Sequence, residues 1–205
     1  RILEIGAGTG STTAPVMRAL EGAGEVFEYV YTDVSPHFLD HGARHHGRGQ
    51  TTRFRLLDIE QELKPQGFAE ERFDLVIASN VLHATADIGQ SLRHVKSLLK
   101  ENGCLLINEV ASVRLITTLT FGLLDGWWRF ADPQRRLPES PLLDPEQWRA
   151  ALEAVGFYDV TRFGQEPNGD RVVQDVIVAL SDGQLADAPP ATEGCEVRVA
   201  EPAAV

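Results

Sequence analysis

The first stretch of the chain, Arg1-Ile2-Leu3-Glu4-Ile5-Gly6-Ala7-Gly8-Thr9-Gly10-Ser11, decides the fold that we expect. A mainly apolar run is followed by three glycines at alternate positions and then by a helical pattern. This order predicts a strand, a tight turn and the start of a helix. Glycine adopts positive φ and lets the backbone approach a ligand closely, and a helix N-terminus presents free N–H groups. The stretch therefore predicts a site for a nucleotide-like cofactor.

The spacing of the glycines narrows the kind of cofactor. The dinucleotide-binding fingerprint is G-x-G-x-x-G, whereas the spacing here is G-x-G-x-G, with Ser11 where that fingerprint has its third glycine. The pattern E-x-G-x-G-x-G resembles the first motif of class I S-adenosylmethionine-dependent methyltransferases, and it consists of Glu4, Gly6, Gly8 and Gly10. The resemblance implies that the acidic residue orients the turn and that the glycines face the methionine part of S-adenosylmethionine. For this stretch alone, a glycine turn of another α/β protein is the alternative.

The composition fits one globular domain and argues against several classes of partner. The chain has 205 residues, of which 43% are hydrophobic and 24% charged, so one sizeable core can form. No apolar run approaches the ~20 residues of a membrane span, and the net charge of −11 argues against a nucleic-acid partner. Cys104 and Cys195 show neither metal nor disulfide spacing, so we expect no metal and a reducing, cytoplasmic location. Because the first residues already have the pattern of a core strand, we expect no signal peptide and a longer parent polypeptide.

Strand and helix patterns alternate along the chain. We expect strands at residues 2–5, 25–32, 51–57, 73–79, 104–108, 157–163 and 172–180. We expect helices at about residues 11–21, from residue 36, and at 88–99 and 145–155. Strands that alternate with helices predict a parallel, doubly wound sheet, and the last two strands read as a hairpin around residues 167–170. The fold class that we predict is α/β, a Rossmann-like class I methyltransferase fold: a mostly parallel seven-stranded sheet with an antiparallel last strand and helices on both faces.

Four polar residues follow successive strands of this sheet, and they are Asp33, Asp58, Asn80 and Glu109. Ligands bind beyond the carboxyl ends of the strands in such sheets, so we expect all four at one ligand site. With S-adenosylmethionine as the cofactor, Asp33 would hold the ribose hydroxyls, because a carboxylate can accept two hydrogen bonds at once. Asp58 would accept from the adenine amino group, with Ile59 against the ring, and Asn80 would also stand at the cofactor.

Several further stretches, taken in order, resemble the C-methyltransferase domain of a modular polyketide synthase. They are Tyr31-Thr32-Asp33-Val34-Ser35-Pro36, Leu57-Asp58-Ile59-Glu60 with Gln66-Gly67-Phe68, Asn80-Val81-Leu82-His83-Ala84-Thr85, and Phe121-Gly122-Leu123-Leu124-Asp125-Gly126-Trp127-Trp128. The resemblance covers about residues 1–180, and it implies transfer of a methyl group to the α-carbon of a β-ketoacyl chain. That chain would be bound to the phosphopantetheine arm of an acyl carrier protein, with neighbouring synthase domains in cis. The family also has an N-terminal lid region, which this sequence lacks.

Residues 113–130 interrupt the alternation with a long apolar and aromatic stretch. The stretch is either a core helix with a packed loop or a wall over a ligand pocket, and its glycines and paired tryptophans favour the wall. With the resemblance above, Phe121 and Leu124 would pack along a channel for the acyl chain and pantetheine. Trp127 and Trp128 would exclude water from the enolate.

His83 and Glu109 are the candidate catalytic residues. A carbon between a ketone and a thioester is a nucleophile only after it loses a proton, and at neutral pH this requires a general base. Histidine is the side chain best matched to pH near 7, and His83 follows the end of a predicted strand. Glu109, at the neighbouring strand, could accept the other ring N–H, which fixes the tautomer and stabilises the imidazolium. The resemblance places the family's catalytic dyad at the same two positions; a packed histidine and a salt-bridged glutamate are the alternatives.

Two other functions stay open from the sequence. One is a non-catalytic, methyltransferase-like scaffold domain of a synthase, although such a domain would be expected to lose some site residues and all are present here. The other is a small-molecule O-methyltransferase, which can also use a histidine base. The Gly126-Trp127-Trp128 stretch weighs against it.

The chain ends in a stretch dominated by Ala, Pro, Gly and acidic residues, so we expect residues 1–180 to form the methyltransferase core and residues 181–205 a disordered linker. Carrier proteins are usually acidic, and a chain of net charge −11 would repel them at long range. A covalent tether would offset this by raising the effective concentration to about millimolar. Arg129, Arg135 and Arg136 are the expected docking residues, since arginine suits a phosphate or a carboxylate; a basic loop without a partner is the alternative.

Overall fold

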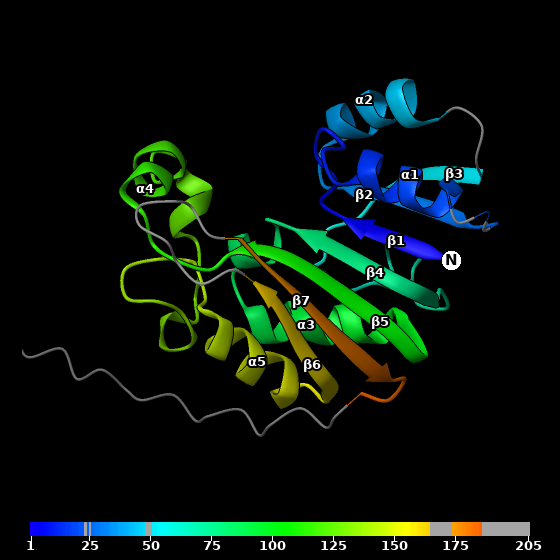
Figure 1. Cartoon of the computed structure of the whole chain (residues 1–205). Coiled ribbons are helices and arrows are strands. Elements are labelled where there is room, and N and C mark those ends of the chain that lie inside the picture. Colours follow the sequence, from blue (N-terminus) through cyan, green and yellow to red (C-terminus); the bar gives the residue numbers. More distant parts are fainter. Residues whose placement is uncertain (23, 25, 48–50, 165–173, 186–205) are drawn as a thin grey trace, which may run out of the picture.

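The structure is a computed structural model that describes residues 1–22, 24, 26–47, 51–164 and 174–185. Within these residues seven strands form one sheet in the order β3-β2-β1-β4-β5-β7-β6 (Figure 1). The strands are β1 (Ile2–Ile5), β2 (Glu28–Asp33), β3 (Thr51–Leu56), β4 (Phe73–Ser79), β5 (Leu99–Val110), β6 (Phe157–Gly164) and β7 (Gln174–Asp182). The α-helices are α1 (Thr13–Gly22), α2 (Pro36–His46), α3 (Ile88–Ser97), α4 (Leu115–Phe121) and α5 (Pro145–Ala154), and the 3₁₀ helices are η1 (Leu82–Ala84), η2 (Asp125–Trp128) and η3 (Pro133–Arg135).

The sheet is parallel except at one strand. β1 pairs in parallel with β2 and β4, β2 pairs with β3, and β4 pairs with β5. β7 is antiparallel to both of its neighbours, β5 and β6. The predicted fold class is thereby confirmed. The carboxyl ends of β1 to β5 all meet at one edge of the sheet, where ligands of this type of fold bind.

Two hydrophobic cores cover the two faces of the sheet. The larger core packs α3 and α5 against one face, and Leu92 and Trp148 are fully buried in it. The smaller core contains Met17 of α1 and Tyr29 of β2, with Leu39 of α2 packed against it on the other face (Figure 1). Because the central strands are covered on both faces, they read as near-continuous apolar runs in the sequence.

The strand β5 is longer at both ends than the expected 104–108. The sequence pattern predicts that Asn102 and Gly103 end the preceding helix. They lie instead within β5, where its pairing with β7 shifts register, and Asn102 has φ of 58°. An Asn-Gly pair allows left-handed backbone in a strand bulge as readily as at a helix end. Glu109 therefore lies inside β5, opposite Asp175 of β7, rather than after the strand.

Other boundaries shift by a few residues. α1 begins at Thr13 rather than Ser11, because the residues before it still belong to the glycine turn. β2 begins after Val26, which is 99% exposed. β7 runs two residues beyond the boundary expected at residue 180, and Ser181 is fully buried in it. The predicted hairpin turn at 167–170 and most of the predicted linker, 186–205, lie outside the described residues.

The segment between β5 and α5 carries α4, η2 and η3 and lies beyond the carboxyl edge of the sheet (Figure 1). Residues 113–130, for which the sequence favoured a wall over a ligand pocket, form α4 and η2 in this segment. Among the described residues, no helix is long and apolar enough to cross a membrane.

Candidate active site

The glycine turn between β1 and α1 has three residues in the left-handed region. Gly6, Gly8 and Gly10 have φ of 60°, 58° and 80°, which glycine adopts without steric cost. An added Cβ on Gly6 would lie 2.4 Å from Val81, and one on Gly10 would lie 2.2 Å from His46. One on Gly8 would meet only the carbonyl oxygen of Gly6, at 4.0 Å. The turn is thus packed on two sides and open beside Gly8, as a backbone cradle for a ligand requires.

Glu4 braces this turn from beneath. Its side chain is 1% exposed, and its Oε2 accepts hydrogen bonds from the hydroxyls of Thr13 at 2.5 Å and Tyr29 at 2.6 Å. Burial raises the pKa of Glu4, and the two hydrogen bonds partly offset that rise. The carboxylate therefore ties β1 to the start of α1 and to β2. It supports the turn through the protein, from the buried side.

Asp33, the last residue of β2, faces the turn. Its Oδ2 accepts from the backbone N–H of Gly8 and its Oδ1 from that of Ser35, each at 2.9 Å. Each carboxylate oxygen has a second lone pair, so both can still accept from a pair of ribose hydroxyls. Tyr31 donates its hydroxyl to the Gly8 carbonyl at 2.6 Å, and burial raises the pKa of Tyr31 to about 12. The turn, its open side and Asp33 together fit a nucleoside cofactor such as S-adenosylmethionine.

Asp58 lies after β3, in a loop that the side chain of Gln66 organises. Gln66 accepts from the backbone N–H of Asp58 at 2.8 Å and donates to its carbonyl at 2.9 Å. Asp58 Oδ1 accepts from the N–H of Glu60 at 3.0 Å. Ile59 is 4% exposed and belongs to the larger core, so little of it faces a ligand. The adenine roles of Asp58 and Ile59 stay predictions.

Asn80 links the glycine turn to the candidate base. It follows β4 with φ of 51°, a conformation that asparagine tolerates better than most residues, and its Oδ1 accepts from the N–H of Val110 at 3.2 Å. The chain then turns so that Val81 packs on Gly6, as the short Cβ distance at that glycine shows. His83 follows two residues later. The turn and the base are therefore neighbours in space.

His83 and Glu109 form a buried pair. His83 is 7% exposed and Glu109 is fully buried, and Nδ1 of the ring lies 2.5 Å from Oε2 of the carboxylate. Oε1 accepts from the backbone N–H groups of Val81 at 3.0 Å and Leu82 at 2.9 Å. Because a carboxylate oxygen accepts hydrogen bonds, its contact with the ring assigns the ring proton to Nδ1 and leaves a lone pair on Nε2. The structure brings together the two residues that the sequence indicated as catalytic, and their roles stay predictions.

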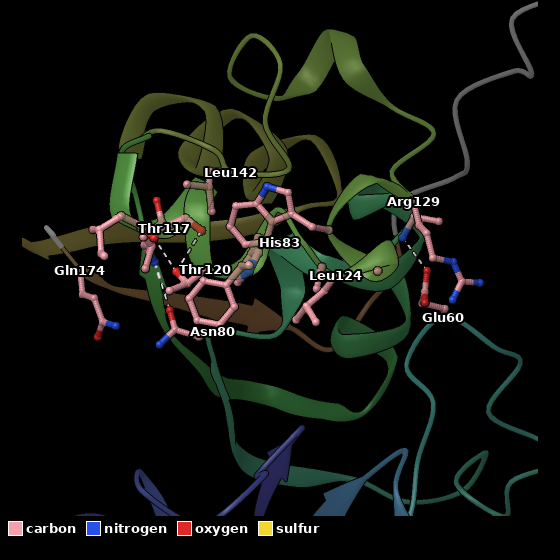
Figure 2. A pocket seen from close by; sticks show the side chains of 16 residues that line it. Glu60, Asn80, His83, Thr117, Thr120, Leu124, Arg129, Leu142 and Gln174 are labelled. Carbon is pink, nitrogen blue, oxygen red and sulfur yellow. Dashed lines mark hydrogen bonds between the residues drawn. The ribbon is translucent and has the colours of Figure 1, made fainter. Parts of the chain in front are cut away.

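A pocket of about 600 Å³ opens beside His83 (Figure 2). Phe121, Leu124 and Trp127 line it. The sequence predicted these residues for a substrate channel, and that role stays a prediction. Trp127 is 8% exposed; its ring meets His83 edge-on and stacks on Phe121, with centroids 5.6 Å apart in both cases. Trp128 is not among the described lining residues: it is 48% exposed, and its indole N–H donates to a backbone carbonyl at 2.9 Å.

The pocket also uses residues for which the sequence suggested another role or none. Figure 2 shows Asn80, predicted at the cofactor, with Gln174 on one side of His83, and Arg129, predicted for docking, with Glu60 on the other. The cofactor role of Asn80 stays a prediction. Further lining residues include Thr117, Thr120 and Leu142. Gln174 is the first residue of β7 and Leu142 precedes α5, so only the tertiary fold brings them here. No local pattern in the sequence could have signalled them.

Arg136 is buried, which contradicts the docking role expected for it. It is 3% exposed, and its donors bond backbone carbonyls and Asp132. Arg129 lines the pocket and Arg135 is half-buried. An arginine in a polar loop is predicted to be exposed from sequence alone. Arg136 is buried only because the folded loop brings it to the carbonyls of His83 and Thr85.

The other histidines lie apart from this pair. His94 Nδ1 contacts the carbonyl oxygen of Ile59 at 2.7 Å, and His41 stacks on His45. In the part of the chain that the structure describes, no group of three or more His, Cys, Asp and Glu side chains could hold a metal ion.

The sequence and the fold both have known relatives. Residues 3–105, half of the chain, match the family described as "Methyltransferase domain". Polyketide synthase PksM of Bacillus subtilis is 44% identical over 185 residues, which cover 89% of this chain and 4% of that protein. The DszA carbon methyltransferase is 44% identical with a TM-score of 0.82 over 89% of this chain and 47% of the solved chain. The trans-methyltransferase CalH, solved as a complex with SAH, is 36% identical with a TM-score of 0.80 over 88% of this chain and 51% of the solved chain.

This chain thus spans about half of those solved chains and a small part of the synthase. The strand order, the glycine turn and the family match agree with one another, and S-adenosylmethionine is the cofactor of this class. The chain therefore belongs to the methyltransferase domain family, as a domain similar to the carbon methyltransferases of polyketide synthases.

Proposed function

We propose that this chain transfers a methyl group from S-adenosylmethionine to the α-carbon of a β-ketoacyl thioester on an acyl carrier protein, within a cytoplasmic polyketide synthase. One observation carries the proposal: the buried His83–Glu109 pair borders an apolar-walled pocket and stands next to the glycine turn. Carbon methylation needs a base beside the methyl donor, whereas a scaffold domain needs neither.

His83 is the general base in this proposal. Glu109 holds the Nδ1 proton, so Nε2 has its lone pair free to take the α-proton of the thioester. The carboxylate then faces an imidazolium, whose charge it stabilises. Because Glu109 is fixed by two backbone N–H groups as well, the ring is held in one orientation.

The pocket wall suits an acyl chain and its pantetheine arm. Phe121, Leu124 and Trp127 supply apolar surface beside the base. With Trp127 8% exposed and in edge contact with His83, water has little room between the ring and the wall. A dry site strengthens the electrostatic stabilisation of a developing enolate.

The cofactor would be held at the glycine turn. Gly6, Gly8 and Gly10 would lie against its methionine part, Asp33 would accept from its ribose hydroxyls, and Asp58 would accept from its adenine amino group. S-adenosylmethionine supplies a methyl group on a positively charged sulfur, which a carbanion-like carbon can attack. The CalH structure holds SAH, the product that such a transfer leaves behind.

Intact-protein mass spectrometry tests the proposal. A carrier protein loaded with a β-ketoacyl chain is incubated with this chain and S-adenosylmethionine, and we expect the carrier to gain the mass of one methylene group. Fragmentation should place the gain on the α-carbon. A carrier loaded with the matching α,α-dimethylated chain is the control and should gain nothing.

Two results would contradict the proposal. No gain of mass, in a chain that binds S-adenosylmethionine, would favour the scaffold function. A gain on an oxygen atom of the β-ketoacyl chain, or methylation of free hydroxylated small molecules alone, would favour an O-methyltransferase.

A further inference from the structure

Arg136 carries a buried guanidinium near the candidate active site, and most of its N–H donors are hydrogen-bonded. Its side chain is fully buried, and its Nη1 donates to the carbonyl oxygens of His83 at 2.6 Å and Pro141 at 2.7 Å. Its Nη2 donates to the carbonyl oxygen of Thr85 at 2.7 Å, and its Nε donates to Asp132. Four of the five N–H donors of a guanidinium are thereby engaged.

Two of these acceptors are the carbonyl oxygen of the candidate base itself and that of the residue two positions after it. The carbonyls of His83 and Thr85 belong to η1 and the residue after it, so one rigid fork spans the loop that carries the imidazole. On its other edge that loop is held by Glu109, which bonds the N–H groups of Val81 and Leu82. The main chain around His83 is therefore fixed from both sides.

Asp132 anchors the guanidinium and the pocket wall together. Its Oδ1 accepts from Arg136, and its Oδ2 accepts from the N–H of Ile88, the first residue of α3, at 2.9 Å. The N–H of Ala131 also donates to the carbonyl oxygen of Ala86 at 2.8 Å. The segment that follows Trp127 is thereby tied to the loop that carries the base.

We propose that Arg136 is a positioning residue for carbon methylation. Its guanidinium holds the His83 loop so that Nδ1 stays on Glu109 and Nε2 stays aimed into the pocket. The catalytic part of this inference rests on the proposed function. The position of the His83 ring on Glu109 can be measured without turnover.

Lysine at position 136 would keep the positive charge but lose the planar set of N–H donors that spans several carbonyl groups. An ammonium is a point donor on a flexible stem, whereas the planar guanidinium spans several acceptors at fixed angles. In Arg136→Lys we expect kcat to fall on the order of 10- to 100-fold, the loss typical of a reacting group displaced by about 1 Å. Arg136 touches neither the substrate nor the cofactor site directly. The KM for the carrier substrate and the affinity for S-adenosylmethionine should therefore stay within about twofold, which corresponds to a small difference in binding free energy.

Lys96→Met is the matched control. Lys96 is also a buried cation, and it donates to the carbonyl oxygen of Gly156 at 2.5 Å and pairs with Asp182 at 2.8 Å, on the far side of the larger core. Its loss should lower the melting temperature and leave kcat per folded molecule unchanged. If Arg136 only contributed stability, Arg136→Lys would behave in the same way.

The deciding readout is the titration of the His83 ring, followed by ¹⁵N NMR in the full chain with labelled histidine. The charged groups around this ring are Glu109 from β5, Glu60 and Arg129 of the same pocket lining, and the Arg136–Asp132 pair behind its loop. Asp175 stands opposite Glu109 on β7 and pairs with Arg162 of β6. In Arg136→Lys we expect the His83 ring to titrate at lower pH, because an imidazolium that moves away from Glu109 loses its stabilisation. His83→Ala assigns the signal.

The outcomes separate this inference from the proposed function. A shifted titration with lost kcat supports the inference, and a shifted titration in a chain whose wild type does not methylate supports the geometric claim while the proposed function fails. An unchanged His83 titration in folded Arg136→Lys overturns the inference, and so does an unchanged kcat. If Arg136→Lys does not fold, Asp132→Asn is the substitute, because it weakens the anchor of the guanidinium. It must shift the His83 titration in the same direction by a smaller amount. No shift in Asp132→Asn overturns the inference.

Discussion

The glycine turn and the His83 loop lie side by side at the same edge of the sheet, and they are held by different parts of the chain. The turn is braced from within the first β–α–β unit: Glu4 of β1 accepts from the hydroxyls of Thr13 in α1 and Tyr29 in β2, and Asp33 at the end of β2 accepts from the N–H of Gly8. The His83 loop is held by Glu109, 26 positions away, and by Arg136, 53 positions away.

This difference separates binding from chemistry. The first two strands and the helix between them supply the brace of the turn, so changes there should act on cofactor affinity and local stability. The loop that carries the base depends on β5 and on the segment between α4 and α5, so changes there should act on rate. Each prediction below tests one side of that division.

The largest effect is expected on the side of the base. His83→Ala should lower kcat by about 10²–10⁴, the usual loss when a general base is removed, with S-adenosylmethionine affinity unchanged by calorimetry. Glu109→Gln should lose less, because the imidazole remains and only its tautomer and orientation are affected. Methylation by His83→Ala at the wild-type rate would contradict the division, and so would a larger loss in Glu109→Gln.

The two tryptophans of η2 form a matched pair for the pocket wall. Trp127→Leu should lower kcat/KM about 10- to 100-fold, because it removes the ring that packs against His83 and shapes the approach of the substrate. Trp128→Leu should change it little, since that ring is half exposed and outside the described wall. Steady-state kinetics on a carrier-bound substrate would measure both. Equal losses would assign the effect to the helix rather than to the pocket.

On the side of the turn, Gly8 and Gly10 form a second matched pair. Both have positive φ, so alanine at either position should cost about 1–2 kcal/mol of stability from backbone strain alone. Gly10→Ala should cost more, because its Cβ would stand 2.2 Å from His46, and adding His46→Ala should recover the difference. Urea unfolding measures both free energies. Equal costs, or no recovery in the double variant, would show that His46 does not pack on the turn.

The smallest effect concerns the pH dependence of the brace. Burial raises the pKa of Glu4 in the folded state above its unfolded value. Between the two values the folded state binds more protons, so the free energy of unfolding must fall as pH rises through that window and stay level above it. Wild type should therefore lose stability relative to Glu4→Gln as pH rises through the window. A difference between the two that grows in the opposite direction would contradict the burial of an ionisable carboxyl beneath the turn.

The same division explains what could be predicted from the sequence. The glycine turn, Glu4 and Asp33 could be placed because their partners come from neighbouring elements and follow a compact motif. His83 and Glu109 could be paired because parallel strands end at one edge, although Glu109 proved to lie inside β5. Arg136 could not be placed, because a charged residue in a loop gives no sign of burial until the loop is folded onto η1. Gln174 reached the pocket in the same way, through the antiparallel pairing of β7.

The central claim is that His83 removes the α-proton of a carrier-bound β-ketoacyl chain. The most direct measurement is the rate at which that α-carbon exchanges hydrogen with D₂O, followed by mass spectrometry on the loaded carrier without any methyl donor. We predict that the wild-type chain exchanges the α-hydrogens faster than the carrier alone does, and that His83→Ala returns the rate to that background. Equal acceleration by wild type and His83→Ala would show that another group is the base, and no acceleration by the wild type would show that this chain supplies none.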